Sequence, residues 1–256
     1  GVGVYYIYAS QVKKPEVAAI YLKADGSGDY PTLERAVQHI TEGGTITLGA
    51  GTYRLSQPLE INKSINLIGA GMDQSIVAAT SEYYVIRFSG EGSFVLQGLT
   101  VQLEGGGKAD VVRVDNGNLD FSDCRFKGDG NNLQGLRVLA NAKGTVKDCE
   151  AINNGETGFV IQGQAQLILE NNKCTNNKEG GIGFYENAQG TARQNKCTGN
   201  KSGIVVSNQA RVDLEENITS DNREIGIFYS DNTSGTVRLN DCSSNGNSGI
   251  WIQDQV

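Results

Sequence analysis

The polar side chains that could carry chemistry in this sequence are few. Asp110, Asp129 and Glu156 supply carboxylates, which can act as general acids or bases, and Arg137 supplies a cation. Asp129 and Glu156 fall in turns that are longer than their counterparts later in the chain, and such insertions often mark a binding face. We therefore treat these four residues as candidates for a site, against the plainer interpretation that they belong to ordinary surface loops.

Aromatic side chains offer a second kind of candidate. The positions two residues after each repeat glycine should form one outward row, with Tyr185 facing outward nearby. This row contains Arg137, Val160, Gly183, Val205, Phe228 and Trp251. Exposed aromatic rings can stack on sugar rings or contact a protein partner. The alternative is that Phe228 and Trp251 lie beneath a further coil or a cap.

The sequence lacks the residues that several other kinds of catalytic or metal site require. The sequence has one histidine, His39, no adjacent pair of aspartates and no CxxC motif, so a serine nucleophile has no plausible base and a zinc site is not expected. The run Gly128-Asp129-Gly130-Asn131-Asn132 offers fewer oxygens than calcium requires. A solvated turn is the favoured interpretation, with calcium as a weak alternative, and we expect no metal centre and no cofactor.

The candidates are set within a repeat of about 23 residues. Glycines recur at Gly135, Gly158, Gly181, Gly203, Gly226 and Gly249, in steps of 23, 23, 22, 23 and 23. Apolar residues follow one and three positions after each glycine, which places them on the same, inward face of a strand. Stacked coils of three short strands would bury a core that no single coil could make. This pattern predicts an all-β fold.

Further columns keep a similar period and favour structural roles. Asparagines recur in two columns, which we interpret as stacked turns. One contains Asn172, Asn195, Asn217 and Asn240, and the other contains Asn177, Asn200, Asn222 and Asn245. Glu170, Arg193, Glu215 and Arg238 alternate in charge and should pair across neighbouring strands. A second register steps by 25, 25, 23, 22 and 23 residues and predicts one column of buried free thiols, with Thr219 in place of one cysteine. It runs through Cys124, Cys149, Cys174, Cys197, Thr219 and Cys242.

The N-terminal part is organised differently. Residues 32–40 have one apolar face, formed by Leu33, Ala36, Val37 and Ile40, which predicts a short helix that caps the first coil. Residues 21–256 are then a single domain. Residues 1–20 form a lead-in segment that we interpret as a strand, a linker or the remnant of a membrane span. No apolar run reaches the ~20 residues of a complete span.

The charge of the chain narrows the class of partner. The formal net charge is −7, and lysines and arginines form no stripe, which argues against a nucleic acid partner. A polysaccharide and a protein remain as candidate partners. The sequence makes no prediction of oligomeric state.

Taken together, the repeat units resemble the right-handed parallel β-helix, or pectate-lyase-like, superfamily. Asn172-Lys173-Cys174-Thr175-Asn176-Asn177 followed by Gly180-Gly181-Ile182 is a typical unit. The opening, from Asp25-Gly26-Ser27-Gly28-Asp29 through Gly51-Thr52-Tyr53, is similar to that of pectin methylesterases. That family places a glutamate where this chain has Leu55, and its later catalytic motifs are missing. The resemblance therefore implies the fold and an extracytoplasmic location, and transfers no catalytic residue.

Two functions follow as hypotheses. The first is a non-catalytic β-helix module, such as the ectodomain of a larger protein, that binds a carbohydrate or a protein partner through Tyr185, Phe228 and Trp251. The second is a polysaccharide lyase, hydrolase or epimerase acting on uronic-acid polymers, with a carboxylate site near the longer turns. Because a fold of this kind hosts many activities, the site must decide between them.

Overall fold

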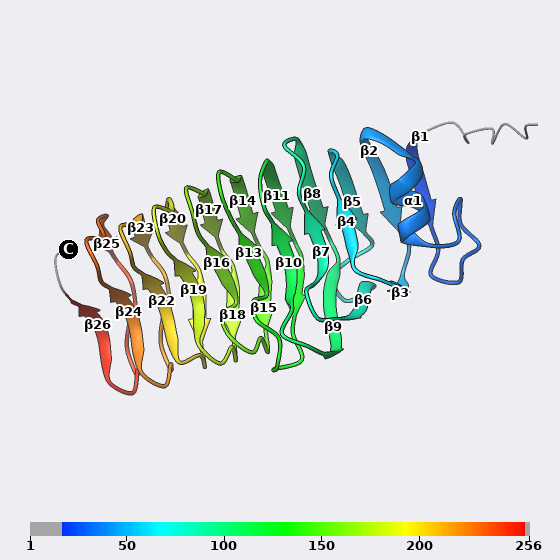
Figure 1. The fold of residues 1–256 in the computed structure, drawn as a ribbon. Coiled ribbons are helices and arrows are strands. Elements are labelled where there is room, and N and C mark those ends of the chain that lie inside the picture. Colours follow the sequence, from blue (N-terminus) through cyan, green and yellow to red (C-terminus); the bar gives the residue numbers. More distant parts are fainter. Residues whose placement is uncertain (1–16, 254–256) are drawn as a thin grey trace, which may run out of the picture.

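The strands are stacked as coils that form one elongated parallel β-helix (Figure 1). The computed structural model describes residues 17–253. Within that range each coil passes through three sheets in turn, and successive coils pair through parallel ladders. The predicted all-β architecture with three strands per coil is confirmed.

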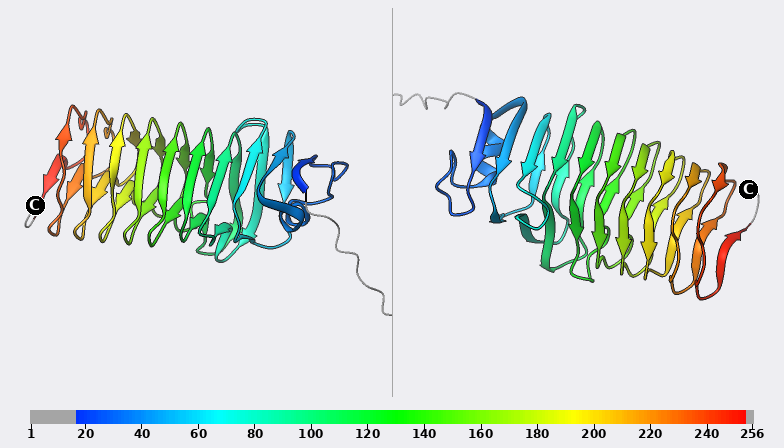
Figure 2. Two further views of the ribbon diagram at one scale, coloured as in Figure 1. Left: turned by 90° about the horizontal axis from the view of Figure 1, so that it is seen from above. Right: turned by 180° about the vertical axis from the view of Figure 1, so that it is seen from behind.

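The three sheets run along the length of the stack (Figure 2). The ten-stranded sheet contains β1 (Val17–Leu22), β2 (Ile40–Leu48), β5 (Ile65–Gly69), β8 (Ser93–Gln97), β11 (Asn118–Ser122), β14 (Lys143–Lys147), β17 (Gln166–Glu170), β20 (Gln189–Arg193), β23 (Arg211–Glu215) and β25 (Val237–Arg238). The seven-stranded sheet contains β3 (Gly51–Arg54), β6 (Ser75–Ser81), β9 (Thr100–Gly106), β12 (Arg125–Lys127), β15 (Glu150–Ile152), β18 (Lys173–Thr175) and β21 (Lys196–Thr198). The nine-stranded sheet contains β4 (Leu59–Ile61), β7 (Tyr84–Phe88), β10 (Asp110–Val114), β13 (Leu136–Val138), β16 (Phe159–Ile161), β19 (Gly180–Phe184), β22 (Ser202–Val206), β24 (Ile225–Tyr229) and β26 (Ser248–Ile252).

One short helix, α1 (Leu33–His39), lies at the N-terminal end of the described stack, at the place that the sequence predicts (Figure 1). The hydroxyl of Thr32 caps it by accepting a hydrogen bond from Arg35 N at 3.3 Å. Leu33, Ala36 and Val37 are buried. No helix among residues 17–253 is long and apolar enough to span a membrane. The interpretation of the lead-in as a membrane remnant concerns residues 1–16, which lie outside the described residues.

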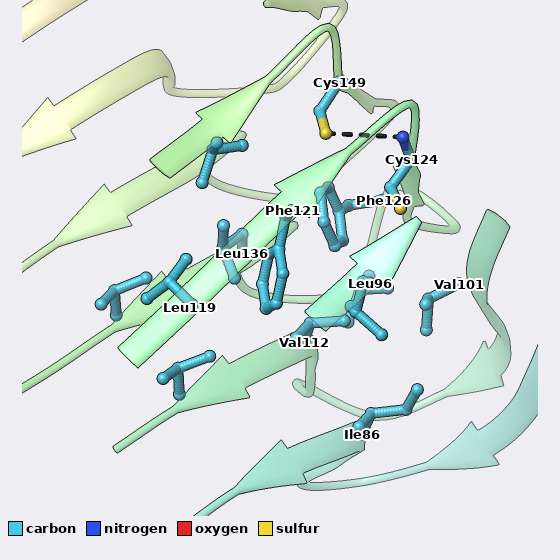
Figure 3. Close-up of a cluster of buried hydrophobic side chains, with 14 of the residues drawn as sticks. Ile86, Leu96, Val101, Val112, Leu119, Phe121, Cys124, Phe126, Leu136 and Cys149 are labelled. Carbon is cyan, nitrogen blue, oxygen red and sulfur yellow. Dashed lines mark hydrogen bonds between the residues drawn. The ribbon is translucent and has the colours of Figure 1, made fainter. Parts of the chain in front are cut away.

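The core is a continuous apolar column inside the coils. Phe94 and Phe121 lie in successive coils and have ring centroids 5.3 Å apart. Phe121 and Phe126, on adjacent strands of one coil, have centroids 6.0 Å apart (Figure 3). The inward columns predicted from the repeat are buried through Tyr229. In the last coil Ile250 and Ile252 are 46% and 58% exposed, because no described coil packs on them.

Two columns of buried asparagines bridge the coils, as the sequence predicts. Asn195 Nδ2 donates to Asn217 Oδ1 at 3.0 Å, and the bonds repeat from coil to coil. Each side chain also donates to a backbone carbonyl at the turn. The first column contains Asn172, Asn195, Asn217 and Asn240; the second contains Asn132, Asn154, Asn177, Asn200, Asn222 and Asn245, and so begins two coils earlier than predicted.

The predicted single column of cysteines is wrong. Cys174 pairs with Cys197, but its partner in the preceding coil is Ala151, not Cys149. Cys149 instead stands at the head of the first asparagine column, where its N–H donates to Asn172 Oδ1 at 2.9 Å. Cys124 N donates in turn to Cys149 Sγ at 3.4 Å (Figure 3). The thiols are free and four are buried, as predicted, but they occupy two columns two residues apart.

The alternating charged row lies on the outer face of the ten-stranded sheet. Glu170, Arg193, Glu215 and Arg238 pair strand to strand, and Arg193 Nη2 lies 2.7 Å from Glu170 Oε2. Arg238 also pairs with Glu215. These exposed pairs fix strand register and add little free energy individually.

Candidate functional site

A straight row of side chains runs along the outer face of the nine-stranded sheet. The sequence predicted its second part, from Arg137 to Trp251. The structure extends it through three earlier coils, so that three arginines stand on consecutive strands. In order, the row contains Glu60, Arg87, Arg113, Arg137, Val160, Gly183, Val205, Phe228 and Trp251.

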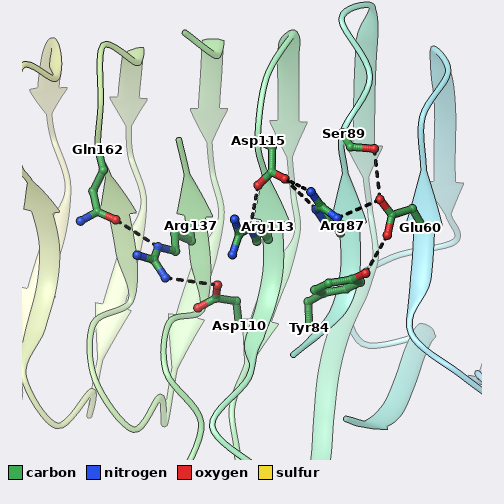
Figure 4. Close-up of polar contacts among 9 residues, drawn as sticks. All are labelled: Glu60, Tyr84, Arg87, Ser89, Asp110, Arg113, Asp115, Arg137 and Gln162. Carbon is green, nitrogen blue, oxygen red and sulfur yellow. Dashed lines mark hydrogen bonds and ion pairs between the residues drawn. The ribbon is translucent and has the colours of Figure 1, made fainter. Parts of the chain in front are cut away.

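Two of the three arginines share one carboxylate (Figure 4). Arg113 Nε lies 2.6 Å from Asp115 Oδ1, and Arg87 Nε lies 2.6 Å from Asp115 Oδ2. Burial opposes the ionisation of Asp115, but the hydrogen bonds from Arg113 and Arg87 outweigh it and lower its pKa. Arg87 also contacts Glu60 at 3.1 Å, and the hydroxyl of Tyr84 donates to Glu60 at 2.6 Å.

Arg137 is held differently (Figure 4). Its Nε donates to the neutral amide oxygen of Gln162 at 3.0 Å, while its Nη1 lies 3.9 Å from Asp110 Oδ2. Asp110 is 2% exposed, and its Oδ1 accepts a long bond of 3.3 Å from Gln134 N. Burial raises the pKa of Asp110 to about 6, although Arg137 partly opposes this. Arg137 therefore keeps donor capacity for an external anion.

Two hollows meet at Arg137. The larger, of about 430 Å³, extends toward β16 and β19; its walls include Arg137, Glu156, Gln162 and Tyr185. The smaller, of about 320 Å³, extends toward β7, and Asp110, Arg113 and Tyr83 are among its lining residues. Leu133 and Arg137 belong to both. The hollows thus form one polar depression over neighbouring strands.

Tyr185 forms part of the floor of the larger hollow. Its ring lies against Gly183: a Cβ added to this glycine would be 2.4 Å from Tyr185 Cε2 and 2.7 Å from its hydroxyl oxygen. The missing side chain at Gly183 therefore lets the ring lie against the sheet. Burial raises the pKa of the Tyr185 phenol, so the hydroxyl stays protonated at neutral pH.

The amide of Gln134 fixes one wall of the same hollow. Its Nε2 donates to Glu156 Oε2 at 2.6 Å, and its Oε1 accepts from Thr157 N at 2.9 Å. The Glu156 carboxylate is therefore held at the hollow and keeps acceptor capacity. The joined hollows are lined by four carboxylates and three tyrosine rings, which include Asp110, Glu156 and Tyr185 beside Arg137.

A comparison with known protein families identifies the repeat. The family model described as "Right handed beta helix region" matches residues 110–255, which is more than half of the chain. The chain belongs to the right-handed β-helix family. This β-helix is also similar to pectinesterase 31 of Arabidopsis thaliana, with 28% identity over 180 residues, which cover 59% of this chain and 54% of that protein. The chain thus spans about half the length of this curated relative.

Solved structures show the same fold at low sequence identity. The A-module of the mannuronan C-5 epimerase AlgE4 of Azotobacter vinelandii superposes with a TM-score of 0.68 at 22% identity, over 82% of this chain and 65% of that one. Pectate lyase Pel9A superposes with a TM-score of 0.69 at 18% identity, over 94% of this chain and 75% of that one. At such identities the likeness establishes the fold of this β-helix alone.

The β-helix brings four of the seven predicted site residues together. Asp110, Arg137, Glu156 and Tyr185 line the joined hollows. Asp129 lines neither hollow, because its Oδ1 accepts hydrogen bonds from Asn131 N and Asn132 N within its own turn, at 2.8 and 3.1 Å. Its carboxylate therefore organises the turn that we considered for calcium. Among residues 17–253, no group of three or more His, Cys, Asp or Glu side chains could hold a metal ion.

Phe228 and Trp251 lie on the same row, several strands beyond Arg137. Their rings pack edge to face with centroids 6.0 Å apart. Trp251 is 44% exposed. The pair is thus an aromatic surface at the far end of the row, separate from the hollows.

Sequence reasoning missed Arg87, Arg113 and Asp115. The signal that could have found them is the row itself, continued upstream from Arg137. In that part of the row, successive residues are 24, 26 and 27 positions apart in the sequence instead of 23. The regular spacing is therefore lost in the coils that carry the charged residues.

Proposed function

We propose that this β-helix binds an acidic polysaccharide along the outer face of its nine-stranded sheet, with Arg137 as the residue that receives a carboxylate. One observation carries the proposal. Arg87 and Arg113 both bond Asp115 at 2.6 Å, and Arg87 also pairs with Glu60 at 3.1 Å. Arg137, by contrast, faces a carboxylate at 3.9 Å and a neutral amide. A guanidinium with free donors suits a carboxylate, which it can hold in a bidentate manner.

The shape of the face suits a linear polymer. Between Arg137 and Phe228 the row consists of the small residues Val160, Gly183 and Val205, which leave a low strip. Trp251 lies five strands beyond Arg137, or ~24 Å at the usual strand spacing of ~4.8 Å. Rings at Tyr185, Phe228 and Trp251 could contact sugar faces along this path.

The similar proteins support a polysaccharide over a protein partner. Their names refer to pectin, pectate and mannuronan. We extend this substrate class, and an extracytoplasmic location, to the present chain as part of the proposal.

The test compares two arginine variants. Arg137→Ala should weaken binding to polygalacturonate or alginate by about tenfold or more, because it removes a charge-assisted contact. Arg193→Ala is the matched control. Arg193 lies on the ten-stranded sheet, away from the proposed site, and is paired there with Glu170. Equal affinity of the wild type and Arg137→Ala for every acidic polymer would remove the proposal.

Asp110 favours a second candidate function, a lyase, hydrolase or epimerase acting on the same polymer. A buried carboxyl with a pKa of about 6 can exchange a proton near neutral pH, and it lines a hollow beside Arg137. The observation to seek is product formation from pectate, methyl-esterified pectin and alginate. Asp110→Asn should abolish turnover and retain binding, and the absence of turnover by the wild type across this panel would leave binding as the function.

A further inference from the structure

A second depression lies on the outer face of the ten-stranded sheet, across β14, β17, β20 and β23. It consists of two adjoining hollows of about 560 and 530 Å³, which share Gln189 and Arg211. None of its lining residues belongs to the hollows around Arg137. It is therefore a separate surface, and its argument does not depend on the function proposed above.

The larger hollow is a groove between two rows of outward side chains. The two rows follow the register of the sheet, so the groove crosses the strands. One row contains Lys143, Gln166, Gln189 and Arg211, and the other contains Thr145, Ile168, Thr191 and Asp213.

The floor of the groove is the backbone of the middle row of the sheet. Gly144 and Gly190 flank Leu167 in the middle row. A Cβ at Gly144 would lie 1.8 Å from Leu119 O, and one at Gly190 would lie 2.1 Å from Leu167 O. The side-chain positions of this row face the core, as the buried Leu167 shows, so a larger residue at 144 or 190 would require the backbone to shift.

Seven of the polar side chains along this groove have no bonding partner within the described residues. Within residues 17–253, the side chains of one row and of the adjoining turns make no hydrogen bond or ion pair. This contrasts with the bonded asparagine columns and with the paired row from Glu170 to Arg238 on the same sheet. The unpaired set comprises Lys143, Gln166, Gln189 and Arg211 on the strands and Asn187, Gln209 and Asn232 at the turns.

We propose that this groove is a second carbohydrate-binding surface, which takes an extended acidic oligosaccharide laid across the coils. Carboxamides supply both donors and acceptors, as sugar hydroxyls require. Ile168, 45% exposed between two threonines, offers an aliphatic surface to the C–H face of a ring. A peptide strand would need a free sheet edge to add to, and this groove lies on the face of interior strands.

The charges of the groove select an acidic ligand. Lys143 and Arg211 lack a carboxylate partner, and they stand three strands apart, or ~14 Å at the usual strand spacing. The one carboxylate of the groove, Asp213, already accepts hydrogen bonds from Thr236 N and Oγ1 at 2.9 and 2.8 Å. The unpaired charge is thus positive, and it favours carboxylate or sulfate groups on the glycan.

The test isolates this surface by working in the Arg137→Ala background, which disables the first candidate site. The probes are oligogalacturonates and neutral gluco-oligosaccharides of equal length, with affinity measured by titration calorimetry. Binding of the acidic probe should remain, and the added pair Gln189→Ala and Arg211→Ala should weaken it by about tenfold. Ile168→Asp should weaken it as well, because it places a negative charge in the groove. All three positions lie at the surface, so the fold should tolerate the changes.

One matched control defines the site. Arg193→Ala removes a cation of the same sheet outside the groove and should leave the affinity unchanged. The proposal is overturned if the groove variants bind as tightly as their parent, or if Arg193→Ala is as harmful as Arg211→Ala. Preference for the neutral probe, or protection of the groove by a protein and by no glycan, would also overturn it.

Discussion

Asp110 Oδ2 lies 3.9 Å from Arg137 Nη1, which is close enough for attraction and too far for a hydrogen bond. The buried carboxyl thus receives only partial compensation from its neighbouring cation, and burial keeps its pKa near 6. This single relationship links the candidate site to the stability of the fold and to the proposed binding of anions.

The first prediction concerns stability against pH. The pKa of Asp110 rises from 3.8 in the unfolded chain to about 6 in the folded chain, so its contribution is full below pH 4 and is lost as pH rises through 6. The loss amounts to roughly 3 kcal/mol for a shift of this size. Denaturant titrations should show that the free energy of unfolding of Asp110→Asn, relative to wild type, increases between pH 4 and 7. A constant difference across that window would contradict the assignment.

The second prediction concerns ligand binding against pH. Protonation of Asp110 removes the internal competitor for Arg137, so an acidic polysaccharide should bind more tightly at pH 5 than at pH 7.5. The carboxyls of a uronate polymer remain largely ionised at pH 5, given an ordinary carboxyl pKa near 4. Asp110→Asn should bind with nearly the same affinity at both values. The charged groups that face Asp110 are Arg137, Arg113 and Glu156, so Glu156→Gln is the control that should keep the pH dependence.

The fold could be predicted from the sequence because stacking repeats each requirement in every coil. From Gly135 onward the coils have nearly equal length, and the outward row, the asparagine columns and the charged row follow directly. The candidate site could be predicted only in part. Asp110 and Arg137 stood out because of their neighbouring turns, but their proximity depends on coils of unequal length. The bond from Arg87 to Asp115 crosses such coils, and no period shows it.

The cysteines show the same limit in another way. A step of 25 residues separates Cys124 from Cys149 and also Cys149 from Cys174, but the two steps have different causes. The first reflects a longer coil, since Arg125 pairs with Glu150. The second reflects a change of column, since Glu150 pairs with Lys173. Sequence spacing alone cannot separate an inserted loop from a shift along the strand.

The third prediction tests this correction. Cys149→Asn should be tolerated at a cost of about 1 kcal/mol or less, because position 149 continues a column in which each asparagine accepts a backbone N–H from the coil before. Cys174→Asn should cost about 3 kcal/mol or more, because that thiol is fully buried among apolar side chains and offers an amide no such ladder. Chemical denaturation measures both. Equal losses would favour the single column.

The fourth prediction concerns the asparagine columns. Asn195→Ala removes the bonds to Leu169 O and Asn217 Oδ1 and leaves Asn172 N and Nδ2 without their acceptor. Unsatisfied buried groups of this kind cost about 1–3 kcal/mol each, so a total loss of roughly 3 kcal/mol is expected. The control is Asn118→Ala, since Asn118 is exposed on β11 and should change stability by less than about 0.5 kcal/mol. Similar unfolding midpoints for the two variants would argue against a structural role of the column.

The fifth prediction separates the floor of the hollow from the stability of the coil. Gly183→Ala places a Cβ 2.4 Å from the Tyr185 ring, which is the far end of a side chain and can move. The variant should therefore fold with a loss of about 1 kcal/mol or less, yet it should weaken acidic polysaccharide binding as much as Tyr185→Ala does.

The contrasting variant is Gly190→Ala, whose Cβ would meet Leu167 O at 2.1 Å, a backbone atom that cannot swing aside. It should destabilise the coil by about 2 kcal/mol or more, since the strand must shift to accommodate it. Thermal unfolding and binding titrations of the three variants distinguish the two effects. If Gly183→Ala binds like the wild type while Tyr185→Ala does not, the ring reaches the ligand from a position other than the one against Gly183.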